Sequence, residues 1–284
     1  PLPEQKRIVK AIEQAFEKIT EIETNKKELE ELADKVKAKT LGLAIRGKLV
    51  SQNPKDEPAS VLLEKIKKEK EKLIKAGKIR KEKQDSYIYK SSDNLYYQNN
   101  ESINKHFLFE IPKGWQIEKL GNVCDISRGG SPCPIQKYLT TSNDGINWIK
   151  IGDAKLGSKY ITSAKEKIIP SAMEYSRYVK SGDFLLTCSM SFGHPYILKI
   201  DGCVHNGWII IDHIEHVFNC DFLYYALSSD TIYRLFTSLS TGSTVKNLQI
   251  DTVKSVCFPI PPLSEQKRIA SKIELIFKQI DLLN

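Results

Sequence analysis

The sequence lacks the features that usually identify a membrane, secreted or metal-binding protein. It contains no uninterrupted apolar run of membrane-spanning length, and it does not open with a basic segment followed by an apolar one. Its six cysteines include no C-x-x-C pair, so their spacing predicts no metal site. We therefore expect a cytoplasmic protein with reduced, scattered cysteines and no contact with a membrane.

Motifs for catalysis are also missing. An amino methyltransferase needs a glycine-rich cofactor loop and an Asn/Asp-Pro-Pro-aromatic motif, and neither occurs. Asp153 and Lys155 imitate part of a nuclease site, but no second carboxylate lies near them in the sequence. A hydrolase triad of Ser189, His194 and Asp201 would need a nucleophile elbow around the serine, and none is present. The sequence favours a non-catalytic protein without a cofactor of its own.

The chain does have an excess of positive charge. Its formal net charge is +8, which suits a partner rich in phosphate. Much of the excess lies in one lysine-rich run between Glu64 and Lys83. Such a run is usually the solvated face of a helix, so charge alone does not establish nucleic-acid binding.

The strongest pattern is an internal repeat. PLPEQKRIVKAIEQAFEKI opens the chain, and PPLSEQKRIASKIELIFKQI occurs near its end. They align without a gap, with identities at Pro1/Pro262, Leu2/Leu263, Glu4/Glu265, Gln5/Gln266, Lys6/Lys267, Arg7/Arg268, Ile8/Ile269, Ile12/Ile273, Glu13/Glu274, Phe16/Phe277 and Ile19/Ile280. The repeat predicts the same structural unit on both sides of the intervening chain.

Both copies have the periodicity of a helix. In the first, apolar residues alternate at spacings of four and three, which predicts a coiled-coil seam at Ile8, Ile12, Ala15, Ile19, Ile22, Leu29, Ala33, Val36 and Leu43. A rod over residues 4 to 45 would be roughly 60 Å long. We expect Gly47 to end it and Ser264 to cap the second helix, and the two to pair antiparallel. The alternative is a long amphipathic helix lying on a globular core.

The domain organisation follows from these segments. We expect a long spacer helix in residues 1–50, a short helix and polar connector in 51–106, a globular domain in 107–262 and the start of a second spacer helix in 263–284. The connector's helix should run from Ser60 to about Ala76, with Gly77 as its stop. The globular part mixes the strand-like runs NWIKIGD, GDFLLTC, PYILKI and GWIIID with the helical run CDFLYYALSSDTIYRLFTSL. The predicted fold class is α+β: one mixed α/β domain plus long antiparallel coiled-coil helices.

Three polar, glycine-containing loops are the candidate contacts with DNA: SRGGSPCPIQKY, CSMSFGHPY and STGSTVKNL. Their side chains can bind phosphates and base edges, and glycine lets a backbone approach closely. Arginine suits guanine or phosphate, asparagine suits adenine, and lysine suits the backbone. The candidate residues are Arg128, Ser131, Lys155, Lys159, Ser189, Ser191, His194, Tyr196, Asn206, Lys246 and Asn247. Loops are polar in most proteins, so these segments alone do not decide the function.

An ordered set of motifs is more specific: LPEQKRI and LSEQKRI, AIRGKLV, IPKGWQIEKLGNV, WIKIGDAK, SGDFLLT, and STGSTVKNL followed by FPIPPLSEQKRI. With these motifs the chain resembles the DNA-specificity (S) subunits of type I restriction-modification systems. The resemblance covers essentially the whole chain, in the expected order. It implies a target-recognition domain that reads one half of a bipartite site in double-stranded DNA, with the repeated helices as spacers.

The resemblance also implies partners. Methyltransferase (M) subunits would dock on this chain and supply S-adenosylmethionine and adenine methylation, and a restriction (R) subunit would add ATP- and Mg-dependent translocation and cleavage. Such subunits hold two recognition domains, each followed by a helix, whereas this chain carries one. Because it begins PLPEQ and not with Met, we expect sequence upstream, and two alternatives stay open: an excised half, or a short subunit that forms a homodimer through its helices.

A rival interpretation from another class is a non-catalytic coiled-coil adaptor whose globular domain binds protein. The two interpretations differ in where the loops lie. In a DNA reader, the loops at Arg128, Lys155, Ser191 and Lys246 should converge on one positive face, whereas in an adaptor they should scatter.

Overall fold

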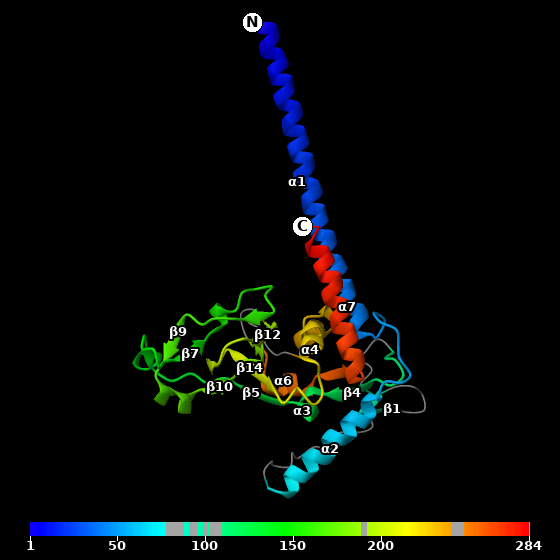
Figure 1. The fold of residues 1–284 in the computed structure, drawn as a ribbon, viewed down its shortest axis with the longest axis vertical. Helices are drawn as coiled ribbons and strands as arrows, with labels where there is room; N and C mark the ends of the chain where they lie inside the picture. The colour runs from blue at the N-terminus through cyan, green and yellow to red at the C-terminus, as the bar shows by residue number, and fades with distance from the viewer. Residues whose placement is uncertain are drawn as a thin grey trace.

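The computed structural model describes residues 1–77, 88–90, 96–98, 101–102, 110–188, 192–239 and 247–283. A long helix leads into a mixed α/β domain, and a shorter helix leaves that domain and returns beside the first (Figure 1). The predicted α+β fold class is confirmed. Within the described ranges, no helix combines the length and apolarity that a bilayer crossing requires.

The first helix, α1 (Leu2–Ile45), has 44 residues and is therefore about 65 Å long. Gly47 ends it as predicted, with a backbone φ of +66°. A Cβ at this position would lie 2.2 Å from Cγ of Pro112, so both the conformation and the space favour glycine.

The last helix, α7 (Leu263–Asp281), runs antiparallel to the C-terminal part of α1 (Figure 1). Nζ of Lys37 lies 2.6 Å from Oδ1 of Asp281 and 5.6 Å from the ring centre of Phe277. The buried residues of α1 are Ala33, Thr40, Leu41, Ala44 and Ile45. The antiparallel pairing is thus confirmed, over the last part of α1.

Two details of the predicted helices are wrong. Val36 was expected in the seam but is 40% exposed, because α7 packs on the neighbouring face that contains Ala33 and Thr40. Ser264 does not cap α7, since the helix begins after Pro262 without a side-chain cap. Its hydroxyl instead lies near Asp56, whose pKa it helps Arg268 to lower.

The connector forms α2 (Ala59–Lys75), close to the predicted bounds, and Gly77 ends it with a φ of +68°. Pro58 precedes the helix, and Ser60 provides no cap. Three short strands follow in one antiparallel sheet: β1 (Ile88–Lys90), β2 (Tyr96–Gln98) and β3 (Glu101–Ser102).

The globular domain contains two five-stranded sheets. The central sheet has the order β5 (Asp125–Arg128), β14 (Trp208–Asp212), β11 (Phe184–Thr187), β12 (Pro195–Leu198) and β8 (Tyr160–Ile161). The outer sheet has the order β10 (Arg177–Val179), β13 (Gly202–Val204), β7 (Ile146–Ile149), β9 (Glu166–Ile168) and β6 (Leu139–Thr140). Neighbours are antiparallel except β12 with β8 and β13 with β7. The four predicted strand-like runs correspond to β7, β11, β12 and β14.

Alternate residues of the central sheet point into two hydrophobic clusters, as the two-residue period of a strand requires. In β11, Phe184 and Leu186 belong to the larger cluster, and Leu185 between them belongs to the smaller one. In β14, Ile209 and Ile210 divide in the same way. The larger cluster includes the end of α1 and the first turns of α7, and the smaller one includes strands of the outer sheet. The helical rod is therefore part of the main core.

Short elements complete the domain. The helical run after residue 219 forms α4 (Cys220–Leu227) and α5 (Asp230–Leu239), as predicted. Strand β15 (Cys257–Ile260) pairs with β4 (Gln116–Lys119) directly before α7 begins. The remaining elements are α3 (Leu120–Val123), α6 (Ile250–Ser255), η1 (Ile135–Lys137), η2 (Ile151–Asp153) and η3 (Pro170–Tyr175).

Candidate nucleic-acid interface

The strand register brings several predicted loops to one end of the central sheet. Arg128, the last residue of β5, pairs with Ile209 near the start of β14. Thr187, the last residue of β11, pairs with Trp208, and Pro195 begins β12 beside the end of β11. The segments that follow or precede these residues must therefore leave the sheet at the same end. We call this region the loop end: residues 128–131, 187–188, 192–194, 205–208 and 247–248.

Arg128 joins three of these segments. Its Nε donates to the carbonyl oxygen of Asn206 (2.8 Å), and its Nη2 donates to Sγ of Cys188 (3.3 Å). Sγ of Cys188 in turn donates to the carbonyl of Gly207 (2.9 Å). The N–H of Asn206 donates to Oγ of Ser131 (3.2 Å). These hydrogen bonds between neighbouring segments hold Arg128, Ser131 and Asn206 in place.

The two glycines after Arg128 allow the segments to pack closely. The N–H of Gly129 donates to the carbonyl of Trp208 (2.9 Å). A Cβ on Gly129 would lie 2.2 Å from the carbonyl oxygen of His205, and one on Gly130 would lie 2.7 Å from that of Tyr175. Any larger residue would push the 128–131 segment away from the 205–207 segment, which explains why the sequence reads RGG here.

Two histidines at the loop end are held neutral. The N–H groups of Gly207 and Ile151 point at the two ring nitrogens of His205, at 2.6 and 3.1 Å. Burial lowers the pKa of His205, and desolvation also lowers the pKa of His194. The exposed imidazole of His194 can accept one hydrogen bond and donate another, which suits contact with a base edge or phosphate, whereas both ring nitrogens of His205 already face backbone N–H groups.

Asn247 reaches the loop end through its neighbour. The N–H of Leu248 donates to the carbonyl of Cys188 (2.7 Å), which places this segment beside the end of β11. Oδ1 of Asn247 is buried and has no hydrogen-bond partner among the described residues. The predicted residues that the structure gathers are therefore Arg128, Ser131, His194, Asn206 and Asn247.

Tyr196 does not belong to this surface. Its side chain is 2% exposed and packs edge-on against Trp208, with ring centres 5.7 Å apart. A side chain in that position cannot reach a duplex outside the domain, so the structure corrects its place among the candidate contacts. All residues of β12 are buried, because the central sheet is covered on both faces.

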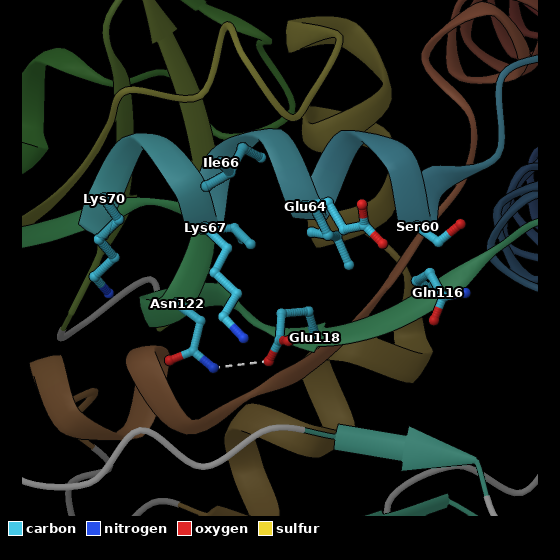
Figure 2. Close-up of a pocket in the computed structure, with 10 residues that line it drawn as sticks. Ser60, Glu64, Ile66, Lys67, Lys70, Gln116, Glu118 and Asn122 are labelled. Carbon is cyan, nitrogen blue, oxygen red and sulfur yellow. Dashed lines mark hydrogen bonds between the residues drawn. The ribbon is translucent and has the colours of Figure 1, made fainter. Parts of the chain in front are cut away.

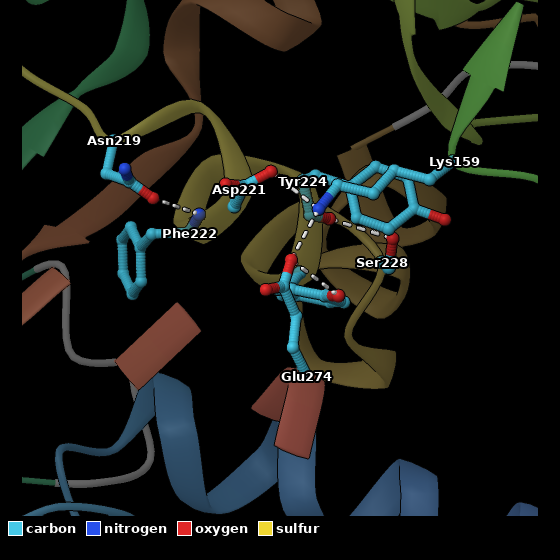
Figure 3. Close-up of polar contacts among 8 residues, drawn as sticks. Lys159, Asn219, Asp221, Phe222, Tyr224, Ser228 and Glu274 are labelled. Carbon is cyan, nitrogen blue, oxygen red and sulfur yellow. Dashed lines mark hydrogen bonds and ion pairs between the residues drawn. The ribbon is translucent and has the colours of Figure 1, made fainter. Parts of the chain in front are cut away.

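Lys159 is also occupied elsewhere, as Figure 3 shows. Its Nζ lies 2.5 Å from Oδ1 of Asp221 in α4 and 2.9 Å from Oε1 of Glu274 in α7. Only 14% of its side chain is exposed. Its charge is therefore neutralised inside the protein, and the structure corrects the expectation that it holds a DNA phosphate.

The remaining candidates do not join the gathered set. Lys155 is exposed between η2 and β8, and within the described part of the chain no recorded contact links it to the loop end. Ser189, Ser191 and Lys246 lie outside the described residues. Of the four loops expected to converge, the described residues place only that of Arg128 at the loop end, so the predicted convergence stays a prediction.

The segments of the loop end are rich in hydrogen-bond donors, although the neighbouring carboxylate of Asp153 acts on His205. The sequences of its segments, together with the intervening residues 189–191 and the preceding residues 240–246, contain no Asp or Glu. They contain arginine, lysine, histidine, asparagine, serine and threonine. Sequence analysis found these residue types but not the packing roles of Cys188 and His205, because only the folded loops bring their partners within reach.

A separate pocket lies between α2 and the β4–α3 segment (Figure 2). Its volume is about 240 Å³, and Lys67, Glu118 and Asn122 are among the residues that line it. Glu118 accepts hydrogen bonds from Nδ2 of Asn122 (2.7 Å) and the N–H of Lys119 (2.8 Å), and its burial raises its pKa. Its carboxylate is already bound by its neighbours, and none of the predicted contact residues lines this pocket.

The described residues offer no site for a metal ion. Across the described ranges, no three His, Cys, Asp or Glu side chains cluster so that they could hold a metal ion. All six cysteines are free thiols.

The sequence was compared with known proteins. The family model described as Type I restriction modification DNA specificity domain matches residues 112–284, which is more than half of the chain. The Escherichia coli type I restriction enzyme EcoEI specificity subunit is 28% identical over 269 residues, covering 88% of this chain and 41% of that protein. The E. coli EcoBI specificity subunit is 38% identical over 178 residues, covering 61% of this chain and 35% of that protein.

One solved structure is similar in fold over most of this chain. A chain from a structure of type I R-M complex assembly and conformational transition has a TM-score of 0.51 and 19% identity, covering 79% of this chain and 51% of that one. An HsdS subunit from Thermoanaerobacter tengcongensis has a TM-score of 0.49 and 22% identity, covering 63% of this chain and 41% of that one. The chain thus spans less than half the length of the curated relatives it matches.

Proposed function

Because the chain belongs to the family of the type I restriction modification DNA specificity domain, we propose that it is a sequence-specific DNA-binding subunit without catalysis of its own. Its globular domain reads one half of a bipartite site in double-stranded DNA. The long helices hold this reader at a set distance from a second one. The whole acts in the cytoplasm as the specificity subunit of a type I restriction-modification enzyme.

One observation carries this proposal: the gathering of donor and acceptor side chains at a loop end whose own described segments contain no Asp or Glu. The bonds recorded for Arg128 use two of its five N–H groups, so others can address a guanine edge or a phosphate. The backbone of Asn206 is fixed while its side chain is exposed, as a contact with adenine requires. An adaptor that binds protein has no need for such a surface.

We assign the remaining contacts by their chemistry. Ser131, Ser189, Ser191 and His194 hydrogen-bond to phosphates or base edges, and Asn247 addresses a base. Lys155 and Lys246 hold the phosphate backbone.

A competition experiment tests the function. The chain, together with its M subunit, is used to enrich duplexes from a randomised pool, and the enriched duplex is then compared with a shuffled one at moderate salt. We expect tight, salt-sensitive binding of the enriched duplex. Arg128→Ala should relax one position of the site by about 1–3 kcal/mol, whereas Lys155→Ala should weaken both duplexes alike. Equal binding of both duplexes by the unaltered chain would favour the adaptor.

The partners follow from the same proposal. M subunits dock on the helices and the globular domain and supply S-adenosylmethionine and the methylation of adenine. An R subunit adds cleavage driven by ATP and Mg. Supporting this division, the sequence of this chain has no motif for either reaction.

We further propose that two copies associate through α1. The apolar side chains Ile8, Ile12, Ile19 and Ile22 are 47% to 66% exposed, and the short α7 does not reach them. A row of apolar residues at heptad spacing is stable in water when a second helix covers it. Sedimentation should show a dimer that Ile12→Lys and Ile19→Lys together convert to a monomer, and a stable monomer of the unaltered chain at high concentration would contradict the pairing.

A further inference from the structure

We infer that Lys159 is a positioning residue, which fixes the globular domain against α7 and so sets the distance between the loop end and the helical rod. The inference rests on the proposed function, because it concerns how that function is made precise. Lys159 lies beside β8, α4 and α7, and only 14% of its side chain is exposed.

The ammonium group of Lys159 lies in a built site. Figure 3 shows the ammonium between the carboxylates of Asp221 and Glu274 and beside Tyr224. The ring centres of Tyr224 and Tyr225 are 5.5 and 4.8 Å from Nζ. The hydroxyl of Tyr225 also donates to Oε1 of Glu274 (3.4 Å). A cation between two anions and two aromatic faces has a narrow choice of position.

The backbone of Lys159 is fixed as firmly as its side chain. Its carbonyl accepts the N–H of Ile197 (3.0 Å), and the next residue begins β8, the edge strand of the central sheet. One end of this residue is therefore part of the sheet that carries the loop end. The other end is bound to α4 and to α7, which pairs with α1.

This link adds to the hydrophobic packing at one edge of the central sheet. Ile269 and Ile273 of α7 belong to the larger cluster, against which Tyr160 of β8 packs, whereas Ile161 of β8 belongs to the smaller cluster between the sheets. Removing the ammonium of Lys159 deletes no member of either cluster. It does remove the polar link between the β8 edge and α7, so we expect the domain to remain folded and its β8 side to move more widely relative to the rod.

The internal repeat supports the same role. Glu274 is an exposed helix residue whose recorded partners are Lys159 and Tyr225, and the first copy of the repeat has Glu13 at the matching position. Neighbouring surface positions differ between the copies, as at Ser271 and Lys10 or Lys278 and Glu17. A carboxylate at this position in both copies is expected if each helix start forms the same ion pair with a globular domain.

The consequence for DNA is a preference for one spacing of the half-sites. Inserting one base pair moves the second half-site by about 3.4 Å along the axis and roughly one tenth of a turn around it. A rigid joint cannot follow that change, whereas a loose one can.

The first test needs no DNA. Spin labels are placed at Thr141→Cys, directly after β6 of the outer sheet, and at Lys27→Cys in α1, both exposed positions, in a full chain that carries Cys133→Ser. The distribution of label distances should be narrow for this chain and clearly broader with Lys159→Met. Lys159→Arg keeps the charge and should restore the narrow distribution. Lys199→Met is the matched control, because Lys199 is exposed and lies 4.5 Å from the ring centre of Tyr160.

The second test uses the enriched duplex with one base pair added to or removed from its spacer. We expect the unaltered chain to lose about tenfold or more in affinity and Lys159→Met to lose about threefold or less, with similar affinity for a single half-site. Glu274→Gln tests the same joint from α7 if Lys159→Met does not fold. Unchanged distance distributions and spacer preference in folded variants would overturn the inference. If the unaltered chain prefers no sequence, the proposed function fails, while the distance measurement still decides the role of Lys159.

Discussion

The starts of α1 and α7 share a sequence but not an environment. In α7, Glu265, Gln266, Ile269 and Ile273 are at most 1% exposed, because the helix docks against the globular domain. Their counterparts at the start of α1 are all exposed. The same residues are therefore core residues in one place and surface residues in the other.

The positions that match explain why both copies exist. Most identities between the two segments fall on residues that α7 uses to contact the domain, including Arg268, Glu274 and Phe277. Most differences fall on positions that α7 exposes, such as Lys272, Leu275 and Gln279. The comparison teaches that the repeat preserves a docking face and not just a helix.

The largest difference between the two helix starts should appear when an isoleucine is truncated. Ile273 is fully buried, so Ile273→Ala removes packing and leaves a cavity, at about 2–5 kcal/mol of unfolding free energy. Ile12→Ala at the matching position, 47% exposed, should change the stability of the monomeric chain by less than about 0.5 kcal/mol, so both variants are compared below the concentration at which the proposed dimer forms. Urea unfolding followed by circular dichroism measures both. Equal losses would mean that α1 is docked in solution as α7 is.

A somewhat smaller contrast is expected for the glutamines. The amide of Gln266 accepts the N–H of Asn219 (2.8 Å) and donates to the carbonyls of Val217 (3.0 Å) and Pro261 (2.9 Å). Gln266→Ala would leave these buried groups without partners, at about 1–3 kcal/mol. Gln5→Ala should have no measurable effect on the same denaturation curve. A Gln266→Ala variant as stable as the unaltered chain would show that water replaces the amide.

The arginines should differ by about 1 kcal/mol, because Arg268 is partly exposed and its ion pair is screened. Arg268 binds Asp56 through Nη2 and Oδ2 (2.6 Å) and through Nη1 and Oδ1 (3.2 Å), which lowers the pKa of Asp56 from 3.8. A lowered carboxyl pKa stabilises the folded state above pH 3.8, and that gain is lost as pH falls through the folded pKa. In Arg268→Gln, the loss of stability at acid pH that Asp56 causes should disappear. In Arg7→Gln, the same loss should remain. Thermal unfolding between pH 2.5 and 5 compares them.

The smallest effect is expected at Glu265. Burial raises its pKa, so the folded state binds its proton more tightly than the unfolded state does. Stability therefore falls as pH rises from 4.5 through the folded pKa. Glu265→Gln should remove this fall and gain less than about 1 kcal/mol at neutral pH, while Glu4→Gln should leave the pH profile unchanged. A loss of stability in Glu265→Gln at neutral pH would show that the hydrogen bond from Gln52 requires the charge.

Much of the fold could be predicted because its signals are local. We located α1 and α7 from the repeat, the heptad spacing and Gly47. Short strand-like runs, each apolar for several residues, located the central strands. The face of α1 that α7 covers could not be read in this way. Thr40 interrupts the predicted apolar line of α1, yet its side chain is buried. Helical spacing defines several neighbouring faces, and the packing of the whole domain selects one of them.

The candidate site was predicted less completely. Polar loops identified Arg128 and Asn206, which the strand register brings together. The sequence could not show that Lys159, unlike these two residues, is bound inside the protein. Its carboxylate partners lie far along the chain in two other elements. Tyr196 was misassigned for a different reason, since its strand is buried on both faces and shows no alternation. Roles that depend on distant partners require the folded structure.

The most direct test of the central claim, that the globular domain between the repeated helices reads bases, is the genome-wide pattern of modified adenines. Residues 107–262 would be replaced by the corresponding segment of another family member, in cells that contain the M subunits. Because the proposed dimer carries the exchanged domain twice, the account predicts that both halves of the methylated bipartite motif change while the gap between them is retained. An unchanged motif in a folded, methylating complex would contradict it.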